Sequence, residues 1–207
     1  MLQILGRANS LNVRKVLWLC EELGIAFERE DWGAGFRSAQ SPEFLALTPN
    51  GLVPVMRDGD FVLWESNTIC RYLATKHRRF DLLPAEAEPR ARIEQWMDWQ
   101  ATELNGAWVY AFMALVRKSE SHRGEAQIQA SVTAWNQQMG ILEAQLSKTS
   151  GFVVGDVFTL ADLVVGLSVH RWFMTPMDHP DLPAVASYYD RLGARPGFQS
   201  HGRNGIP

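Results

Sequence analysis

Ser10 and Asn12 lie in a polar stretch, Arg7–Lys15, that joins an apolar run at residues 2–5 to a helical repeat of apolar residues. Ser10 is a candidate N-cap for that helix, where backbone donors and the positive end of the helix dipole meet. Such a start favours a thiolate over a thiol, and the Ser10 hydroxyl or the Asn12 amide would add a hydrogen bond to the sulfur. From spacing alone, the alternative that Ser10 or Asn12 only caps the helix stays open.

A second candidate functional stretch is Gly51-Leu52-Val53-Pro54, where a proline interrupts a run typical of a strand. Because proline cannot donate to a strand ladder, it indicates a sheet edge or a cis peptide bond in a tight bend. A cis bond would turn the main chain of Val53 outward, leaving its amide and carbonyl free to pair with a peptide ligand. The alternative is an ordinary turn proline.

The third stretch is Trp64-Glu65-Ser66-Asn67, at the expected end of a strand and start of a helix. Glu65 offers a carboxylate to an ammonium group. Ser66 and the amides of the helix start offer donors to a carboxylate, so the pair would suit the two charged groups of an α-amino acid. An ordinary serine cap with an acidic first turn would give the same pattern.

The elements that must position these stretches follow from apolar periodicity and turn residues. The Asp58-Gly59 pair is a hairpin signal. In order, the predicted elements are a strand at 2–5, a helix ended by Gly24, a strand at 25–31, a short helix from Ser41-Pro42-Glu43 through Leu47, hairpin strands Val53–Met56 and Phe61–Trp64, and a helix capped by Ser66. This βαβαββα order predicts an α/β thioredoxin-like N-terminal domain over residues 1–78.

Strand signals stop after that domain, which predicts a linker at 79–88 and an all-α C-terminal helical domain at 89–207. Its expected helices are a long one from Pro89 to about Leu115, a second over Ile128–Leu146, a third opened by the capping-box pattern Thr159-Leu160-Ala161-Asp162, and a fourth from about Pro183 to Leu192. The tail from Arg195 to Pro207 is rich in glycine and proline.

Composition narrows the class of protein. The 207 residues carry a formal charge of −3 without charge blocks, so neither nucleic acid nor membrane is an expected partner. Only Cys20 and Cys70 are present, both at apolar helix positions, which predicts buried thiols and a cytoplasmic, reducing setting without disulfides. The first residues lack the apolar core of a signal peptide, no segment is apolar enough to span a membrane, and no metal-ligand set is expected.

Taken together, the three stretches on a βαβαββα unit, followed by helices with a Thr-x-x-Asp cap, resemble the cytosolic glutathione transferase family over nearly the whole chain. The resemblance is closest to bacterial, theta-like members with a serine in the first loop. It implies a cis Val53-Pro54 bond that binds the cysteinyl backbone of glutathione, and a Glu65-Ser66 pair that binds its γ-glutamyl end. Ser10 would then activate the thiol, with Asn12 as the alternative donor.

The sequence departs from the family pattern at two positions, and the second affects the glycine carboxylate of glutathione. Thr48 stands where many relatives have asparagine, and Leu52 stands where many have a lysine or arginine that reaches this carboxylate. Arg37 or Gln40, in the loop before the second helix, would replace it.

The resemblance implies a glutathione transferase that uses glutathione as co-substrate and joins it to a small hydrophobic electrophile. The electrophile site would lie between the domains, and the protein would be a homodimer. The side chains expected at that site are Trp108, Tyr110, Phe112 and Met113. A glutathione-dependent disulfide reductase or peroxidase, to which the Ser10-Leu11-Asn12 spacing is also similar, and a non-catalytic binding module remain alternatives. The Ser-Ser-Cys first loop of maleylacetoacetate isomerases is missing.

Overall fold

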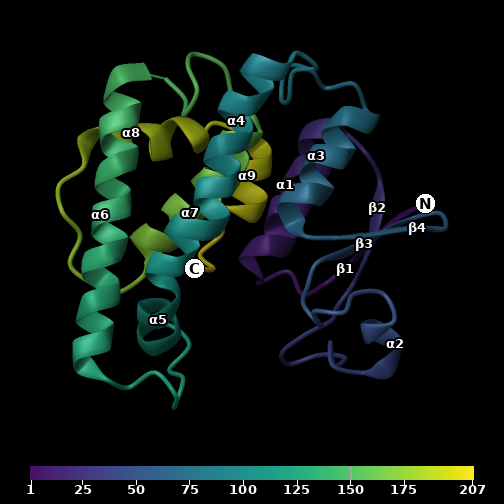
Figure 1. The fold of residues 1–207 in the computed structure, drawn as a ribbon, viewed down its shortest axis with the longest axis horizontal. Helices are drawn as coiled ribbons and strands as arrows, with labels where there is room; N and C mark the ends of the chain where they lie inside the picture. Colours follow the sequence, from purple (N-terminus) through teal and green to yellow (C-terminus); the bar gives the residue numbers. More distant parts are fainter. Residues whose placement is uncertain (150) are drawn as a thin grey trace.

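A four-stranded sheet of order β2-β1-β3-β4 and a bundle of helices make up the chain, one on each side in Figure 1. The computed structural model describes residues 1–149 and 151–207. The first part contains β1 (Leu2–Leu5), α1 (Leu11–Leu23), β2 (Phe27–Glu30), α2 (Pro42–Leu45), β3 (Val55–Asp58), β4 (Phe61–Trp64) and α3 (Ser66–Lys76). The second contains α4 (Ala87–Trp99), the π-helix η1 (Gln100–Leu104), α5 (Asn105–Leu115), α6 (Glu125–Thr149), α7 (Leu160–Met174), α8 (Pro183–Leu192) and α9 (Pro196–His201).

The register of the sheet brings three distant segments to one edge. β1 pairs with β2 in parallel and with β3 in antiparallel orientation, and β3 pairs with β4 in antiparallel orientation. Leu5, at the end of β1, lies opposite Val55 at the start of β3, and Val55 lies opposite Trp64 at the end of β4. The segments that follow β1, precede β3 and follow β4 therefore meet, and the predicted βαβαββα thioredoxin-like order is confirmed.

The hairpin differs from the prediction by two residues. β3 begins at Val55 rather than Val53, because Pro54 has no N–H to donate to the ladder. Arg57 and Asp58 belong to the strand, and the turn falls at Gly59 and Asp60. Gly59 has a φ of 63°, a conformation that glycine adopts without the steric cost of a side chain.

The single long helix predicted from Pro89 to Leu115 is interrupted by one π-helical turn, η1. Gln100, at the start of this turn, is completely buried and donates hydrogen bonds from Nε2 to Ser168 Oγ at 3.0 Å and Asn105 Oδ1 at 2.9 Å. A π-turn widens the helix locally and re-aims its side chains. Apolar spacing alone did not reveal it, because the stripe of apolar residues continues on both sides.

Helix α7 is the centre of the helical part, and nearly all of its residues are buried. Its side chains are mostly apolar around the whole circumference of the helix, which suits a position between the other helices. The short helix α9 was not predicted from the glycine- and proline-rich tail. It packs against α1, with the rings of Trp18 and Phe198 5.1 Å apart and Gly197 leaving no room for a side chain beside Trp18.

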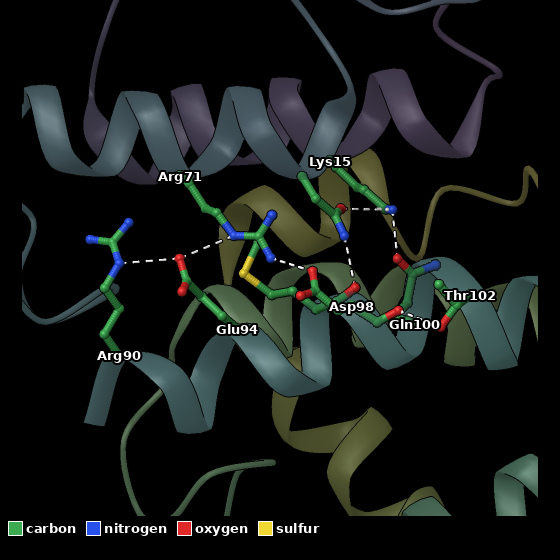
Figure 2. A network of polar contacts seen from close by, with 9 residues as sticks. Lys15, Arg71, Arg90, Glu94, Asp98, Gln100 and Thr102 are labelled. Carbon is green, nitrogen blue, oxygen red and sulfur yellow. Dashed lines mark hydrogen bonds and ion pairs between the residues drawn. The ribbon is translucent and has the colours of Figure 1, made fainter. Parts of the chain in front are cut away.

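A buried polar network joins the two parts of the chain (Figure 2). Lys15 on α1 donates from Nζ to Asn67 Oδ1 on α3 at 3.0 Å and to Gln100 Oε1 at 2.7 Å. Asn67 donates in turn to the Met97 carbonyl on α4 at 2.8 Å. Nearer the surface, Arg71 contacts carboxylates of α4. The starts of α1 and α3 are thus held against each other and against the helical part.

Within the described ranges, no helix combines the length and apolar character that crossing a bilayer requires. Both cysteines are fully buried, as expected. Burial raises the pKa of Cys20 and of Cys70 to about 12, so neither thiol is a nucleophile near neutral pH.

Candidate active site

A cavity of about 230 Å³ lies at the sheet edge where the three segments meet. Its walls include six of the site residues predicted from the sequence, so folding brings together positions more than fifty residues apart. The residues that line it are Arg7, Ser10, Asn12, Thr48, Asn50, Leu52, Val53, Pro54, Trp64, Glu65 and Ser66.

Ser10 is the N-cap residue of α1, and its carbonyl accepts the first helical hydrogen bond from the Arg14 amide at 2.9 Å. Its side chain makes no capping hydrogen bond. In the described part of the chain neither the Ser10 hydroxyl nor the Asn12 side chain has a hydrogen-bond partner. Neither side chain therefore acts as a helix cap. Both residues line the cavity, and their polar groups are available to a ligand beside the helix dipole.

The Val53-Pro54 peptide bond is cis, as predicted. Val53 precedes the first residue of β3 and lines the cavity. No hydrogen bond within residues 1–149 and 151–207 engages its main-chain amide or carbonyl. Val53 therefore presents a free donor and a free acceptor to the cavity, which is what an extended peptide needs in order to pair with the sheet edge.

Glu65 has an unusual backbone, with φ 71° and ψ 109°. A non-glycine residue in this region is strained, and such strain is concentrated at functional sites. Glu65 is the N-cap of α3, and Ser66 is the first helical residue, whereas the sequence predicted Ser66 as the cap. The Glu65 carboxylate makes no capping bond and is exposed, while Ser66 is buried and lines the cavity beside the first amides of α3.

A second cavity, of about 340 Å³, adjoins the first and shares Arg7, Ser10 and Asn12 with it. Its other walls come from α1, α5, α7 and the segment after α5, so it lies between the two parts of the chain. These other walls are Leu11, Asn105, Trp108, Val109, Phe112, Met113, Arg117 and Arg171.

Three of the four residues expected at an electrophile site line this cavity, and Tyr110 does not. The Tyr110 hydroxyl accepts a hydrogen bond from the Gly124 amide at 3.3 Å, and its ring packs against His122 with centroids 4.8 Å apart. Tyr110 therefore supports the segment between α5 and α6. Tyr110 lies two residues after Trp108 on α5, so its side chain is on a different face of the helix.

Arg37 and Gln40 lie in different surroundings. Arg37 forms ion pairs with Glu30 at 3.3 Å and Glu43 at 3.0 Å, and its guanidinium lies 4.0 Å from the ring centre of Trp32. Arg37 lines neither the first nor the second cavity. Gln40 lines a third cavity, of about 390 Å³, that shares Arg7, Leu52 and Val53 with the first.

Sequence reasoning missed three arginines at the site. Arg7 lines all three cavities, and Arg117 and Arg171 line the second. Arg7 belongs to the polar stretch before α1, so its place in the first loop was a usable signal. Arg117 follows α5 and Arg171 lies within α7, and no spacing in the sequence connects them with Ser10.

Comparison with known proteins agrees with this geometry. The family described as glutathione S-transferase, N-terminal domain, matches residues 9–76, and the family described as glutathione S-transferase, C-terminal domain, matches residues 104–196. The chain is 36% identical over 201 residues to glutathione S-transferase GstB of Escherichia coli (strain K12), covering 96% of each chain. It is 32% identical over 206 residues to glutathione S-transferase 3 of Zea mays, covering 96% of this chain and 91% of the relative.

A solved structure is similar over the same extent. The theta class glutathione S-transferase from Xanthomonas axonopodis pv. citri, with glutathione bound, superposes with a TM-score of 0.91 at 37% identity, covering 97% of this chain and 96% of that one. The resemblance inferred from the three motifs is confirmed, and the chain belongs to the glutathione S-transferase family.

Proposed function

We propose that this glutathione transferase binds glutathione in the first cavity and joins its sulfur to an electrophile held in the second. The γ-glutamyl end lies against Glu65, Ser66 and the first amides of α3, which complement its ammonium and carboxylate groups. The cysteinyl main chain pairs with the free amide and carbonyl of Val53 beside Pro54. This arrangement directs the thiol toward Ser10, where the two cavities join.

The observation that carries the proposal is the unpartnered Ser10 hydroxyl at the N-cap of α1, on the wall of both cavities. The hydroxyl donates to the glutathione sulfur, and the helix dipole adds to the stabilisation of the thiolate. The thiol loses its proton to solvent. The sulfur lone pair then attacks the electrophilic carbon, and either a leaving group departs with the bonding electrons or an acceptor double bond is saturated.

The size of this effect is sufficient for activity near neutral pH. Lowering a thiol pKa from roughly 8.5 by about two units corresponds to ~2.7 kcal/mol of thiolate stabilisation. One charge-assisted hydrogen bond from Ser10 and a helix start together supply about 2 to 4 kcal/mol. Asn12 lines the same two cavities with a free amide and is the alternative donor.

For the glycine carboxylate we propose Gln40 and Arg7 rather than Arg37. Leu52, which is 65% exposed, offers no charge there. Arg7 and Gln40 line the third cavity, which continues from the first past Val53. Arg37 is already neutralised by two carboxylates.

The test compares Ser10→Ala and Asn12→Ala with the wild-type enzyme, by steady-state kinetics with a chloronitrobenzene over a range of pH. We expect Ser10→Ala to lower kcat at neutral pH and to raise the pH midpoint of the rate by one to two units, since about 1.5 to 3 kcal/mol of thiolate stabilisation is lost. Glutathione affinity should change little, and Asn12→Ala should do less. Loss of activity in Asn12→Ala with an unchanged rate and midpoint in Ser10→Ala would reverse the assignment.

Parallel assays with a mixed disulfide and an organic hydroperoxide address the reductase and peroxidase alternatives. Turnover of these substrates that exceeds conjugation, together with dependence on Asn12, would favour a reductase. Binding to immobilised glutathione without turnover of any of the three substrates would favour a binding module.

We also propose a cytoplasmic homodimer. Reduced, buried Cys20 and Cys70 suit the cytoplasm, where glutathione keeps thiols reduced.

The surface proposed for the dimer is the outer face of β4 and α3. Phe61 is 45% exposed there and packs on Tyr72, with ring centroids 5.0 Å apart. An apolar hollow that includes Leu63 lies beside them. Light scattering after gel filtration should give twice the chain mass, and Phe61→Glu should shift it toward the monomer. A wild-type monomer at micromolar concentration would contradict the dimer.

A further inference from the structure

The side chains that line the second cavity carry a net positive charge. Three of its wall residues, Arg7, Arg117 and Arg171, are cationic, and no carboxylate side chain belongs to the wall. The rest of the wall is apolar or neutral, with Leu11, Val109 and Met113 among its aliphatic members. A site built only for a neutral hydrophobic electrophile has no need of three positive charges.

No carboxylate of the described residues neutralises these three arginines. In the described part of the chain, no salt bridge involves Arg7, Arg117 or Arg171. The side chains of Arg7 and Arg117 donate hydrogen bonds, but the acceptors are neutral groups. Arg7 Nη1 donates to Asn9 Oδ1 at 2.6 Å, and Arg117 Nη2 donates to the Asn9 carbonyl at 3.4 Å. Buried cations in proteins are normally paired with an anion. The cavity therefore has an excess of positive charge that a ligand would balance.

Arg171 shows this most clearly, because it is only 4% exposed and still lines the cavity. Its guanidinium carbon lies 4.0 Å from the ring centre of Phe112 and 4.4 Å from that of Trp108. These cation–π contacts use the face of the guanidinium, whereas its N–H donors lie in its plane. Its Nε is buried and has no hydrogen-bond partner among the described residues. The in-plane donors of Arg171 are thus left for an acceptor in the cavity.

A fourth arginine lies behind the wall. Arg14 is fully buried and donates from Nη1 to the Ile206 carbonyl at 2.6 Å, while residues 1–149 and 151–207 offer no hydrogen-bond partner to its Nε and Nη2. Burial and the charges of Arg14, Arg117 and Arg7 lower the pKa of Arg171 well below its ordinary value, though an arginine keeps its proton at neutral pH. The repulsion among these cations makes an anion at this position more favourable.

The glutathione thiolate carries a single negative charge and would neutralise at most one of these arginines. Arg7 faces both cavities and is the arginine that serves glutathione in the proposed function. Arg117 and Arg171 line the second cavity and not the first. They lie on the electrophile's side, where an aromatic or aliphatic body would rest against Leu11, Val109 and Met113.

We propose that the electrophile taken by this enzyme is an organic carboxylate, with its anionic group bound by Arg171 and Arg117 and its reactive carbon turned toward the sulfur at Ser10. This inference rests on the proposed function and names its substrate class. The planar donor edge of an arginine matches the two oxygens of a carboxylate, which a neutral electrophile does not supply.

The experiment uses two electrophiles of similar shape, the anionic 4-chloro-3,5-dinitrobenzoate and the neutral 4-chloro-3,5-dinitrobenzamide. For each, kcat/KM at saturating glutathione is divided by the rate constant of the uncatalysed reaction, which removes their difference in intrinsic reactivity. We expect this ratio to be at least about tenfold higher for the carboxylate, since a hydrogen bond to a charged group is worth a factor of ten or more. Raising the ionic strength should reduce the preference.

Three variants locate the effect. Arg171→Met keeps an unbranched apolar side chain against Phe112 and Trp108, and should lower the carboxylate ratio about tenfold or more while changing the amide ratio less than threefold. Arg117→Gln, at an exposed position, should act in the same direction and remains informative if the buried substitution impairs folding. Arg92→Gln, which removes an exposed arginine of α4 far from these walls, is the matched charge control and should leave both ratios unchanged.

Several results would overturn the inference. Equal ratios for the two electrophiles in the wild-type enzyme refute it while leaving the transferase function intact. A folded Arg171→Met variant that loses both activities equally, with a raised pH midpoint, would show that the arginines serve the thiolate instead. Turnover of neither electrophile, nor of a chloronitrobenzene, would refute the proposed function and the inference together.

Discussion

Replacing Asp162 with alanine tests how much the start of α7 contributes to the stability of the chain. Asp162 is fully buried at the third position of the helix. Its Oδ1 accepts from the Val153 amide at 2.7 Å, and its Oδ2 accepts from the Thr159 amide at 2.8 Å and the Thr159 hydroxyl at 3.0 Å. The carboxylate therefore ties the loop before α7 to the helix that forms the centre of the bundle.

The magnitude follows from these bonds. Asp162→Ala leaves two buried backbone N–H groups without acceptors, at about 1 to 3 kcal/mol each, and removes the partner of the Thr159 hydroxyl. The alanine also relieves the burial of a carboxylate, so the net loss is expected to be ~3 to 5 kcal/mol. For a chain of this size that loss lowers Tm by about 6 to 20 °C.

Urea unfolding followed by tryptophan fluorescence, with linear extrapolation to water, measures the change. Asp156→Ala is the matched control, because it makes the same substitution at an exposed position of the same loop, and it should stay within about 0.5 kcal/mol of the wild type. Asp162→Asn, which keeps one acceptor oxygen, should fall between the two. An Asp162→Ala protein within about 1 kcal/mol of the wild type at an unchanged m-value would refute the reasoning.

Three further perturbations have defined outcomes. Ser66→Ala should weaken glutathione binding about tenfold by calorimetry, because a donor to the γ-glutamyl carboxylate is lost, and an unchanged affinity would remove Ser66 from the site. Burial lowers the pKa of His170 to about 4, so the stabilising contribution of this residue is present above its unfolded pKa of roughly 6.5 and is lost as the pH falls toward 4. The free energy of unfolding should decrease over this pH range by up to about 3 kcal/mol. A His170→Gln variant with the same acid sensitivity would contradict this. Gln100→Leu leaves the buried Lys15 ammonium with one acceptor and should cost ~2 to 4 kcal/mol in urea unfolding, whereas a loss below about 0.5 kcal/mol would show that Gln100 is dispensable.

The sequence predicted the order of elements in the sheet domain and most helices of the bundle, because the determinants are local. Gly24 adopts the left-handed conformation expected of a helix C-cap, with φ 64°. Ser41 accepts a hydrogen bond from the Phe44 amide at 3.3 Å, as an N-cap followed by a proline should. Elements that depend on contacts with residues distant in the sequence were not predicted. The π-turn at Gln100 depends on partners from other helices, and α9 depends on the surface of α1.

The same distinction applies to the site. Ser10, Val53, Pro54 and the Glu65-Ser66 pair were predicted because each sits at the start or end of an element that its own neighbours specify. The sheet register then brings those ends together. Which long side chains reach the cavities is decided by packing, since an arginine spans several ångströms and its position along the sequence does not fix its direction.

Tertiary structure alone therefore decided the charge of the second cavity. Arg37 was expected at the site and is neutralised by nearby carboxylates instead, whereas Arg171, a residue of an apolar helix, is held against Phe112 and Trp108 with its donors free. The sequence by itself determined a thioredoxin-like domain with a hydroxyl at the start of its first helix, because those signals lie within a few residues of one another. The convergence of Arg7, Arg117 and Arg171 on one cavity required the packing of α5 and α7 against the first loop, which no local pattern encodes.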